Sequence, residues 1–535
     1  MVNLRLNDCN SSEFDSSVLI DQELSWKTLA RASMGLTNPV INLPSQSEAK
    51  IKASYLHLKR RIEVEGIQVY GVTTGFGDNA KRSVASGTDG MLQENLLAYL
   101  DCAFGDTASA RVSRATLLLR INCFAQGYSA VSPDLVETLI KVFNAGYAPV
   151  LPLEGSLGAS GDLIPLASIG RALQGEGSFY DRNDRIVPAR EVLSRLEMKP
   201  FSFRGKDALG LVNGTSMMTA ISALVLEATH AQWDWIMHSV GASLASLRAH
   251  PSAFSPLVNS RAKRHEGQSE VARLLTRIVG WTADADFAPQ RNTGEHQQSL
   301  QDSYALRCTP QVLGPCWEVI QQAGSLVNGE INSANDNPLV DPDTGAISSG
   351  GNFYGGSIAQ AMDQLAWANA HIADLLDRQI LLLVSESASR GLPPNLSGAH
   401  LNADDPARFA HHGMKGLHQY ATSLTAEIVR LAVPASIFSR STESHNQDKI
   451  SLGTHSAKNA LRSQELLRRL VTLHLACSAQ ALELAKKVHG LEATPPLQAW
   501  LVEVRASVQI LMEDRSLAAE LKQLEARIVA GGVQS

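Results

Sequence analysis

The sequence predicts a mainly α-helical protein, and three features of the 535-residue chain support this prediction. Several long segments carry apolar residues at helical spacing, and strand signals are few. The chain is also long enough to bury a large core without disulfide or metal cross-links. We therefore expect an elongated bundle of long helices and a loop-rich N-terminal domain. A boundary near residue 215, where loops and shorter helices give way to long helices, separates domains 1–215 and 216–535.

The helices can be placed from their apolar spacing and their end signals. They are predicted, in chain order, over residues 91–104, 107–125, 133–145, 215–247 and 454–489. Ser132 can cap a helix that starts at Pro133, and Gly146 lies just past its end. Gly490 similarly follows the last helix.

The last predicted helix carries an apolar stripe at helical steps. Its members are Leu466, Leu470, Leu473, Cys477, Ala481, Leu484 and Val488. A helix of this extent would be roughly 54 Å long at about 1.5 Å per residue. That length exceeds the diameter of a small domain and favours a long bundle.

Composition excludes several classes of protein. Lys and Arg number 47 and Asp and Glu 53, which gives a net charge of −6 and no basic stripe for nucleic acid. The longest apolar stretch, residues 217–226, is too short for a bilayer, and the N-terminus lacks an apolar signal core. The six cysteines are scattered without C-x-x-C spacing. We expect a cytoplasmic protein with no metal and with neither nucleic acid nor membrane as partner.

Three segments interrupt the helical pattern: residues 68–86, 151–162 and 333–356. All three are rich in Gly, Asn, Ser and Thr. Loops held by a rigid helical scaffold are where binding and catalytic residues are usually found. These segments are therefore the first places to look for a functional site.

The segment GSLGASGDLIPLASIG, residues 155–170, is the most informative of these. Its simplest interpretation is a turn in which Ser160 or Asp162 caps the following helix. A chemical interpretation is also open, because the small residues Ala159 and Gly161 allow a backbone cyclisation. The Gly161 nitrogen would attack the Ala159 carbonyl, and Ser160 would lose its hydroxyl as water. The product would be a strong electrophile with an exocyclic C=C bond, built from the chain itself.

Residues 155–170 resemble the signature of the aromatic amino acid ammonia-lyases and aminomutases, the family that contains the histidine, phenylalanine and tyrosine lyases. The resemblance implies that Ala159, Ser160 and Gly161 form 4-methylidene-imidazol-5-one. It also implies the helical fold of the fumarase/aspartase-like superfamily.

Two other cofactors are not expected. The chain has no convincing phosphate loop for pyridoxal phosphate, and the absence of an H-E-x-x-H motif argues against zinc.

Five further segments carry the same resemblance in family order. YGVTTGFG, residues 70–77, is similar to the inner lid loop of the family, whose tyrosine, here Tyr70, is the catalytic base. With a reference pKa of about 10, this phenol needs its pKa lowered to act at moderate pH. KDALGLVNGTS, residues 206–216, supplies Asn213, whose counterpart contacts the prosthetic group and the substrate. Asp207 stands in that segment where the family usually has Glu.

The third segment, QDSYALRCTPQ, spans residues 301–311 and places Gln301, Tyr304 and Arg307 at i, i+3 and i+6. The resemblance implies that Arg307 binds the substrate carboxylate, a task that suits the two-pronged guanidinium group. It also implies a catalytic role for Tyr304 and a substrate-binding role for Gln301.

The remaining two segments complete the site implied by the resemblance. EINSANDNPLVD and GGNFYGG, within residues 330–356, supply Asn337 and Phe353, and the counterpart of Phe353 packs beside the electrophile. TESHNQDKISLG, residues 442–453, supplies Glu443 as a catalytic residue and Gln447 as a substrate-binding residue.

The identity of the substrate depends on a few positions. The family contacts the substrate ring at a residue pair that here is Tyr99-Leu100. Histidine lyases have Ser-His at this pair, tyrosine lyases begin it with His, and phenylalanine lyases have Phe-Leu. Gln447 replaces the Glu of histidine lyases, and Glu443 and Lys415 match the phenylalanine type. We therefore expect L-phenylalanine as substrate, with tyrosine second and histidine less favoured.

The reaction implied is anti elimination of ammonia from an aromatic L-amino acid, which yields a trans-2-enoate. An aminomutase, which uses the same parts but adds ammonia back at Cβ, stays open. A non-enzymatic helical scaffold is the rival from another class. Family members are homotetramers with dihedral symmetry, so Tyr70, the Ala159–Gly161 turn and Arg307 are not expected to come from one chain at one site.

Overall fold

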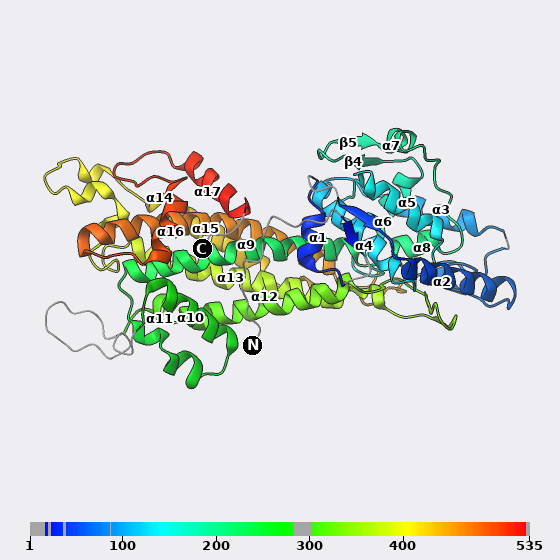
Figure 1. Cartoon of the computed structure of the whole chain (residues 1–535), viewed down its shortest axis with the longest axis horizontal. Helices are drawn as coiled ribbons and strands as arrows, with labels where there is room; N and C mark the ends of the chain where they lie inside the picture. Colours follow the sequence, from blue (N-terminus) through cyan, green and yellow to red (C-terminus); the bar gives the residue numbers. More distant parts are fainter. Residues whose placement is uncertain (1–16, 20–22, 36–38, 86, 283–300, 531–535) are drawn as a thin grey trace. The chain divides into compact units, whose positions relative to one another are not determined.

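The computed structural model describes residues 17–19, 23–35, 39–85, 87–282 and 301–530, and helices dominate them (Figure 1). The prediction of a mainly α-helical fold is confirmed. Cys9, one of the six cysteines, and residue 86, the end of the first predicted loop segment, lie outside the described residues. The chain divides into two compact units. Unit 1 comprises residues 1–224, 326–360 and 436–457, and unit 2 comprises residues 225–325, 361–435 and 458–535. The predicted boundary near residue 215 divides the chain into two continuous ranges. Each observed unit instead combines three separate segments, so the boundary stays a prediction.

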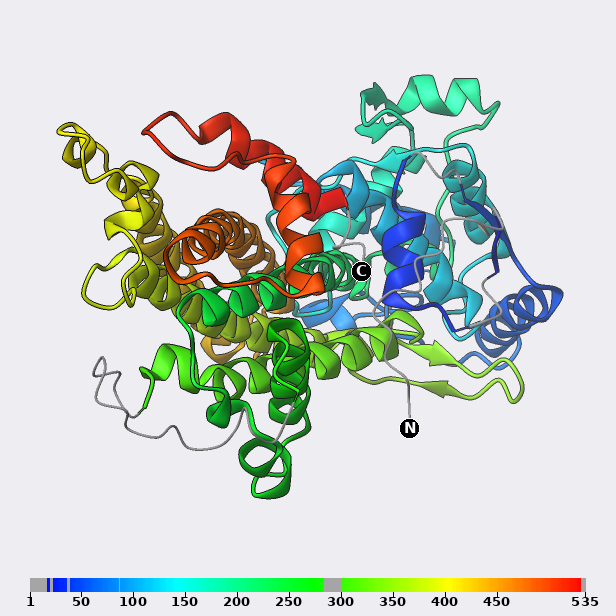
Figure 2. The ribbon, with the colours of Figure 1, turned by 60° about the vertical axis from the view of Figure 1, so that its left-hand side comes forward.

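The described residues of unit 1 form helices of up to 19 residues and three small sheets. Its helices are α1 (Trp26–Ala32), α2 (Ser45–Glu63), α3 (Asp89–Leu100), α4 (Ala110–Ala125), α5 (Pro133–Asn144), α6 (Leu163–Leu173), α7 (Ala189–Arg195) and α8 (Asp207–Val212). Its strands are β1 (Ser17–Leu19), β2 (Val40–Asn42), β3 (Ala148–Pro149), β4 (Ser178–Tyr180), β5 (Ile186–Pro188), β6 (Leu339–Val340) and β7 (Ile347–Ser348). The β1–β2 pair is parallel, β3–β4–β5 is antiparallel, and β6–β7 is the antiparallel hairpin drawn in light green in Figure 2.

Helix α4 is the core of unit 1. All of its residues except Arg111 are buried, including Arg114, Arg120 and Asn122, whose polar groups therefore require partners inside the protein. The predicted start at residue 107 was wrong by three residues, because the Ser109 side chain accepts the Val112 N–H and begins the helix at Ala110. The predicted capping of α5 by Ser132 is confirmed, since its side chain accepts the Leu135 N–H.

Unit 2 contains helices of its own and most residues of the longest helices in the described part of the chain. It contains α10 (Glu266–Val279), α11 (Tyr304–Arg307), α14 (Lys415–Leu431), α16 (Pro495–Arg505) and α17 (Ala518–Ala530). Four helices contribute residues to both units: α9 (Ser216–Ser246), α12 (Thr309–Ile331), α13 (Gly356–Val384) and α15 (Gly453–His489). The long helices predicted over residues 215–247 and 454–489 are thus confirmed. The predicted stripe of α15 is buried except for Val488, which is exposed.

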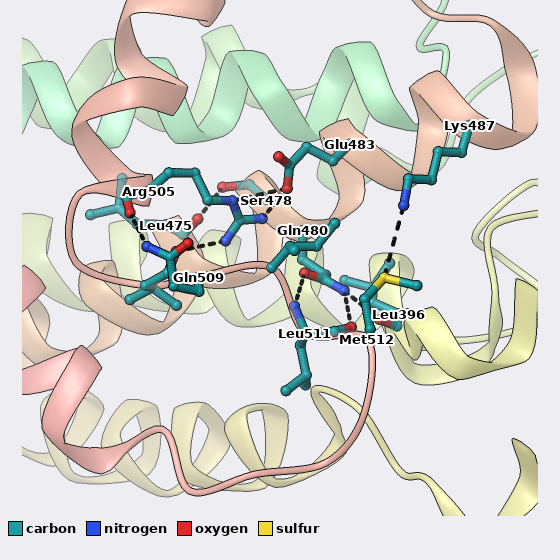
Figure 3. Close-up of polar contacts among 12 residues, drawn as sticks. Leu396, Leu475, Ser478, Gln480, Glu483, Lys487, Arg505, Gln509, Leu511 and Met512 are labelled. Carbon is teal, nitrogen blue, oxygen red and sulfur yellow. Dashed lines mark hydrogen bonds and ion pairs between the residues drawn. The ribbon is translucent and has the colours of Figure 1, made fainter. Parts of the chain in front are cut away.

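Polar side chains connect the helices of unit 2 within the apolar core. His474 of α15 is fully buried and contacts the hydroxyls of Ser239 and Ser243 on α9. Farther along α15, the Gln480 amide donates to the carbonyls of Leu396 and Leu511, which fastens two irregular segments to the helix (Figure 3). None of the described helices is both long and apolar enough to cross a membrane.

Candidate active site

A cavity of about 690 Å³ in unit 1 is lined by eleven of the fifteen predicted site residues. These are Tyr70, Tyr99, Leu100, Ala159, Ser160, Gly161, Asn213, Asn337, Phe353, Glu443 and Gln447. They come from six separate stretches of the sequence. The fold therefore brings together the segments that were selected on composition and resemblance.

Three packed helices position the centre of this site. Helices α3, α6 and α8 contact one another in unit 1. Helix α3 ends with the Tyr99-Leu100 pair, α6 begins just after the Ala159–Gly161 turn, and α8 ends just before Asn213. Each functional segment is therefore attached directly to the end of a rigid element, which limits its movement.

The Ala159–Gly161 turn has a geometry that only glycine allows at its last position. Gly161 has φ of +80°, and its strand-like pairing with Gly214 is continued by a 2.7 Å hydrogen bond from the Asp162 N–H to the Gly214 carbonyl. A Cβ atom on Gly161 would lie 2.1 Å from the Gly214 oxygen. Glycine at this position therefore satisfies both the backbone conformation and the close contact with Gly214, and it places no side chain beside the nitrogen of the predicted cyclisation.

Two side-chain amides hold Ser160 from opposite ends of the residue. Asn213 Nδ2 donates to the Ser160 carbonyl oxygen at 2.8 Å, and Gln447 Nε2 donates to the Ser160 hydroxyl at 3.0 Å. The turn and its amide partners therefore suit formation of the five-membered ring from these three residues.

Asp162 has a role that sequence analysis did not assign. It occupies the N-cap position of α6 but makes no side-chain bond to that helix, so the expected capping of the following helix by Asp162 was wrong. Its buried carboxylate instead accepts the N–H groups of Met217 and Met218 at the start of α9, and the hydroxyls of Ser156 and Thr454. Burial raises the pKa of Asp162, and these four donors oppose that rise.

A second unpredicted residue, Arg120 of α4, lies behind the turn. Its fully buried guanidinium donates to the Gly210 carbonyl, to Ser216 and to Asn335. A Cβ atom on Gly214 would lie 1.9 Å from Arg120 Nη1. No signal in the sequence separates Arg120 from Arg111 and Arg114 on the same helix, because its burial depends on the assembled fold.

The loop that carries Tyr70 is fixed to the same helices. The buried Gln93 of α3 donates to the Gly71 carbonyl at 2.9 Å and accepts the Leu209 N–H of α8 at 3.0 Å. The Gly77 N–H donates to the Tyr70 hydroxyl at 2.9 Å. Gly77 has φ of +56°, a backbone conformation that favours glycine.

Glu443 reaches the Tyr70 loop from a strained turn. Glu443, Ser444 and His445 all have φ between +51° and +66°, a conformation that is costly for residues with a Cβ atom. Backbone bonds between Thr442 and Gln447 close the turn. A Cβ atom on Gly77 would lie only 1.5 Å from Glu443 Oε1, which shows how closely this carboxylate approaches the loop.

The two tyrosines of the cavity favour their neutral forms. Burial raises the pKa of Tyr70, and the negative charge of Glu443 raises it further, against the opposing hydrogen bond from Gly77. Loss of hydration, followed by the charges of Glu443 and Tyr70, raises the pKa of Tyr99 to about 12. Within one chain, the pKa of Tyr70 is therefore shifted away from the direction that a base requires.

Apolar residues complete the cavity wall and were not predicted as site residues. They include Leu96, Leu157, Leu163, Ile164, Leu209 and Val212. An aliphatic side chain in a helix carries no local signal that separates cavity lining from core.

Asp207, which stands where the family usually has Glu, has a structural role. Its carboxylate accepts the Ser132 N–H and hydroxyl at the start of α5.

Four predicted site residues lie in unit 2 and do not line this cavity: Gln301, Tyr304, Arg307 and Lys415. Tyr304 and Arg307 form the single turn α11, and Lys415 is the first residue of α14. The Arg307 guanidinium lies 4.6 Å from the ring centre of Tyr304, which is 71% exposed. The buried Nε atom of Arg307 has no hydrogen-bond partner in the described part of the chain.

Comparison with known proteins decides the family. The model of a family described as aromatic amino acid lyase matches residues 24–506. The chain belongs to the aromatic amino acid lyase family. It is 34% identical over 493 residues to a histidine ammonia-lyase of Symbiobacterium thermophilum, which covers 92% of each chain. It is also 34% identical over 484 residues to a tyrosine ammonia-lyase of Cupriavidus metallidurans, over 88% of this chain and 89% of that protein.

Solved structures of aromatic amino acid lyase relatives have the same fold. A phenylalanine aminomutase of Pantoea agglomerans matches with a TM-score of 0.86 and 27% identity, over 95% of this chain and 98% of that one. Membership makes the chain a carbon–nitrogen lyase, of a family that acts on small amino acids and in general depends on 4-methylidene-imidazol-5-one. Among the described residues, no group of three or more His, Cys, Asp or Glu side chains is arranged to hold a metal ion.

Proposed function

We propose that the protein eliminates ammonia from an aromatic L-amino acid, with L-phenylalanine as preferred substrate and trans-cinnamate as product. The observation that carries this proposal is the cavity of unit 1, which joins the tight Ala159–Gly161 turn to the phenol of Tyr70. In this proposal, Ala159, Ser160 and Gly161 form 4-methylidene-imidazol-5-one without any external cofactor. The ring supplies an electrophile that converts the substrate amine into a better leaving group.

The residues around the turn stabilise charge and move the proton. Asn213 donates to the Ser160 carbonyl oxygen, which is conjugated with the C=C bond after cyclisation. That hydrogen bond stabilises the negative charge that develops on this oxygen. Tyr70, as its phenolate, removes the Cβ proton of the substrate and becomes a neutral phenol, and the Gly77 N–H stabilises the phenolate before this transfer. Glu443, beside the Tyr70 loop, and Tyr304 complete the proposed catalytic set.

The substrate ring is proposed to lie against the Tyr99-Leu100 pair. Leu100 is buried and apolar, and Tyr99 presents a phenol that stays neutral at physiological pH, so the pair favours an uncharged aromatic ring. Asn337, Phe353 and Gln447 line the same cavity and are proposed to contact the substrate. Gln301, Arg307 and Lys415 are proposed to contact its polar end, with Arg307 on the carboxylate.

A second candidate activity is a 2,3-aminomutase reaction, which would yield a β-amino acid. The structural match to a phenylalanine aminomutase supports it, because both activities use the same fold. The products separate the two, since a lyase releases the enoate and a mutase returns ammonia to Cβ.

The proposal is tested by incubating the purified protein separately with L-phenylalanine, L-tyrosine and L-histidine and identifying the products by chromatography. We expect trans-cinnamate from phenylalanine at a kcat/KM at least tenfold above that for tyrosine, and little turnover of histidine. A preference for histidine would refute the substrate assignment, and β-phenylalanine as main product would favour the mutase. No turnover of any of the three would refute the proposed activity.

We also propose a cytoplasmic homotetramer with shared active sites. Arg307 belongs to unit 2 and does not line the cavity, so an assembly in which another subunit supplies it would complete the site. Mixing inactive Tyr70→Phe subunits with inactive Arg307→Ala subunits under exchange conditions should restore part of the activity. No recovery, with exchange verified by a mass label, would refute the shared site.

A further inference from the structure

The strongest feature outside the cavity is a buried ion pair next to the segment that carries Arg307. Asp302 is only 5% exposed, and its carboxylate forms an ion pair with Arg390. The second carboxylate oxygen of Asp302 accepts the backbone N–H of His250 at 2.6 Å. Both oxygens of Asp302 are thus engaged, and the carboxylate cannot turn toward another partner without losing a buried bond.

Arg390 is itself held in a defined position. Its Nη1 donates to the carbonyls of Leu247 and Arg248, each at 2.7 Å, while its Nη2 bonds to Asp302. The Arg390 guanidinium therefore connects Asp302, near the start of segment 301–311, to the residues just after α9. A lysine could form the ion pair but could not reproduce this two-sided geometry.

A second anchor bonds to α11 itself and to the first residue of α12. The buried amide of Gln379, on α13, donates to the Ala305 carbonyl at 3.0 Å and to the Thr309 hydroxyl at 3.4 Å. Arg307 lies between these anchors on a helix of a single turn, which is too short to be stable alone. Its orientation therefore depends on the contacts that flank it.

We propose that Arg390, acting through Asp302, is the positioning residue that orients Arg307 for the substrate carboxylate. This inference rests on the proposed function, in which Arg307 binds that carboxylate. The buried Arg307 Nε without a partner agrees with a guanidinium that is held ready for an anion. Loss of the anchor should weaken the contact with the carboxylate and leave the rest of the substrate contacts in place.

The test compares Arg390→Met with Arg390→Lys and Asp302→Asn, using L-phenylalanine turnover and two inhibitors. trans-Cinnamate carries the carboxylate, and cinnamyl alcohol has the same carbon skeleton without it. We expect Arg390→Met to raise KM and the Ki of cinnamate tenfold or more, with kcat within threefold of wild type and the Ki of cinnamyl alcohol within twofold. Asp302→Asn should act in the same direction, and Arg390→Lys should recover part of the loss.

A matched control and a double mutant separate positioning from general damage. Arg505→Met removes a similar ion pair of unit 2, which Arg505 forms with Glu483 (Figure 3). Arg505 also donates to the Val508 carbonyl. It should leave KM within twofold of wild type. In an Arg307→Ala background, the effect of Arg390→Met on cinnamate binding should shrink to less than twofold, because the residue through which it acts is gone.

Two results would overturn the inference. One is an equal rise of Ki for cinnamate and cinnamyl alcohol in the Arg390 and Asp302 variants. The other is an undiminished effect of Arg390→Met in the Arg307→Ala background. Wild-type protein that turns over phenylalanine while all three variants keep its KM would refute this inference alone. Wild-type protein without turnover or cinnamate binding would refute the proposed function, and the inference would fall with it.

Discussion

Replacing Gly161 with alanine tests whether the geometry of the Ala159–Gly161 turn underlies the activity. The added Cβ would lie 2.1 Å from the Gly214 oxygen, whereas ordinary contact begins at 3.4 Å. The backbone segments at Gly161 and Gly214 must therefore separate by about 1.3 Å. The φ of +80° adds a cost of about 1–2 kcal/mol for a residue with a Cβ atom. A displacement of about 1 Å between reacting atoms can lower a rate about 100-fold, so ring formation should slow by at least about 100-fold.

The assay is the rate of enoate formation from saturating phenylalanine, with circular dichroism as a check on folding. Gly177→Ala is the matched control, because Gly177 has φ of +77° and no heavy atom would lie within 4 Å of the added Cβ. The control carries the same backbone strain without the contact. We expect turnover below about a hundredth of wild type in Gly161→Ala and near wild type in Gly177→Ala.

The reasoning would be refuted by a folded Gly161→Ala protein that keeps more than a tenth of wild-type turnover. Equal loss of activity in both variants would also contradict it, because backbone strain rather than the contact with Gly214 would then be responsible.

Three further predictions concern single side chains. Tyr70→Phe should lower kcat by roughly 100- to 10,000-fold, and a loss below tenfold in steady-state kinetics would exclude Tyr70 as the base. Glu443→Gln should move the rising limb of the kcat/KM pH profile to lower pH, because the Glu443 charge raises the pKa of Tyr70 and the base must be deprotonated. Glu427→Gln, which changes an exposed carboxylate, is the control and should leave the profile in place. A shift to higher pH in Glu443→Gln would contradict the assignment. Burial lowers the pKa of His474 to about 3. The unfolded chain therefore binds this proton more readily, and stability falls as pH drops below the unfolded value of about 6.5, by about 1.4 kcal/mol between about pH 7.5 and about pH 5.5. His474→Gln should flatten that part of the stability curve measured by denaturant unfolding, and an unchanged slope would disagree.

The sequence was most informative where a short string had to satisfy several constraints at once. The role of Tyr70 was predicted from the resemblance of residues 70–77 to the inner lid loop of the family. The turn at Ala159–Gly161 requires small residues and a left-handed glycine. These requirements are local, so they appear in the string itself. The same is true of the Ser132–Pro133 helix start, which the structure confirms.

The residues that hold the site from behind could not be predicted in this way. Asp162 bonds to Thr454, which lies 292 residues farther along the chain, and Arg120 bonds to Asn335 across 215 residues. The sequence around Gln93 does not distinguish it from other helical residues. Its role depends on the fold, which brings the Gly71 carbonyl and the Leu209 N–H of α8 to its side-chain amide. The direction of the Tyr70 pKa shift likewise depends on burial, which only the assembled fold defines.

The central claim is that the chain makes its own electrophile from Ala159, Ser160 and Gly161. It is tested most directly by weighing the tryptic peptide that contains residues 142–171 from the wild-type protein and from Ser160→Ala. We predict that the wild-type peptide is lighter than its sequence by the mass of two water molecules, and that the Ser160→Ala peptide does not lose both. A wild-type peptide of unmodified mass would contradict the proposed mechanism.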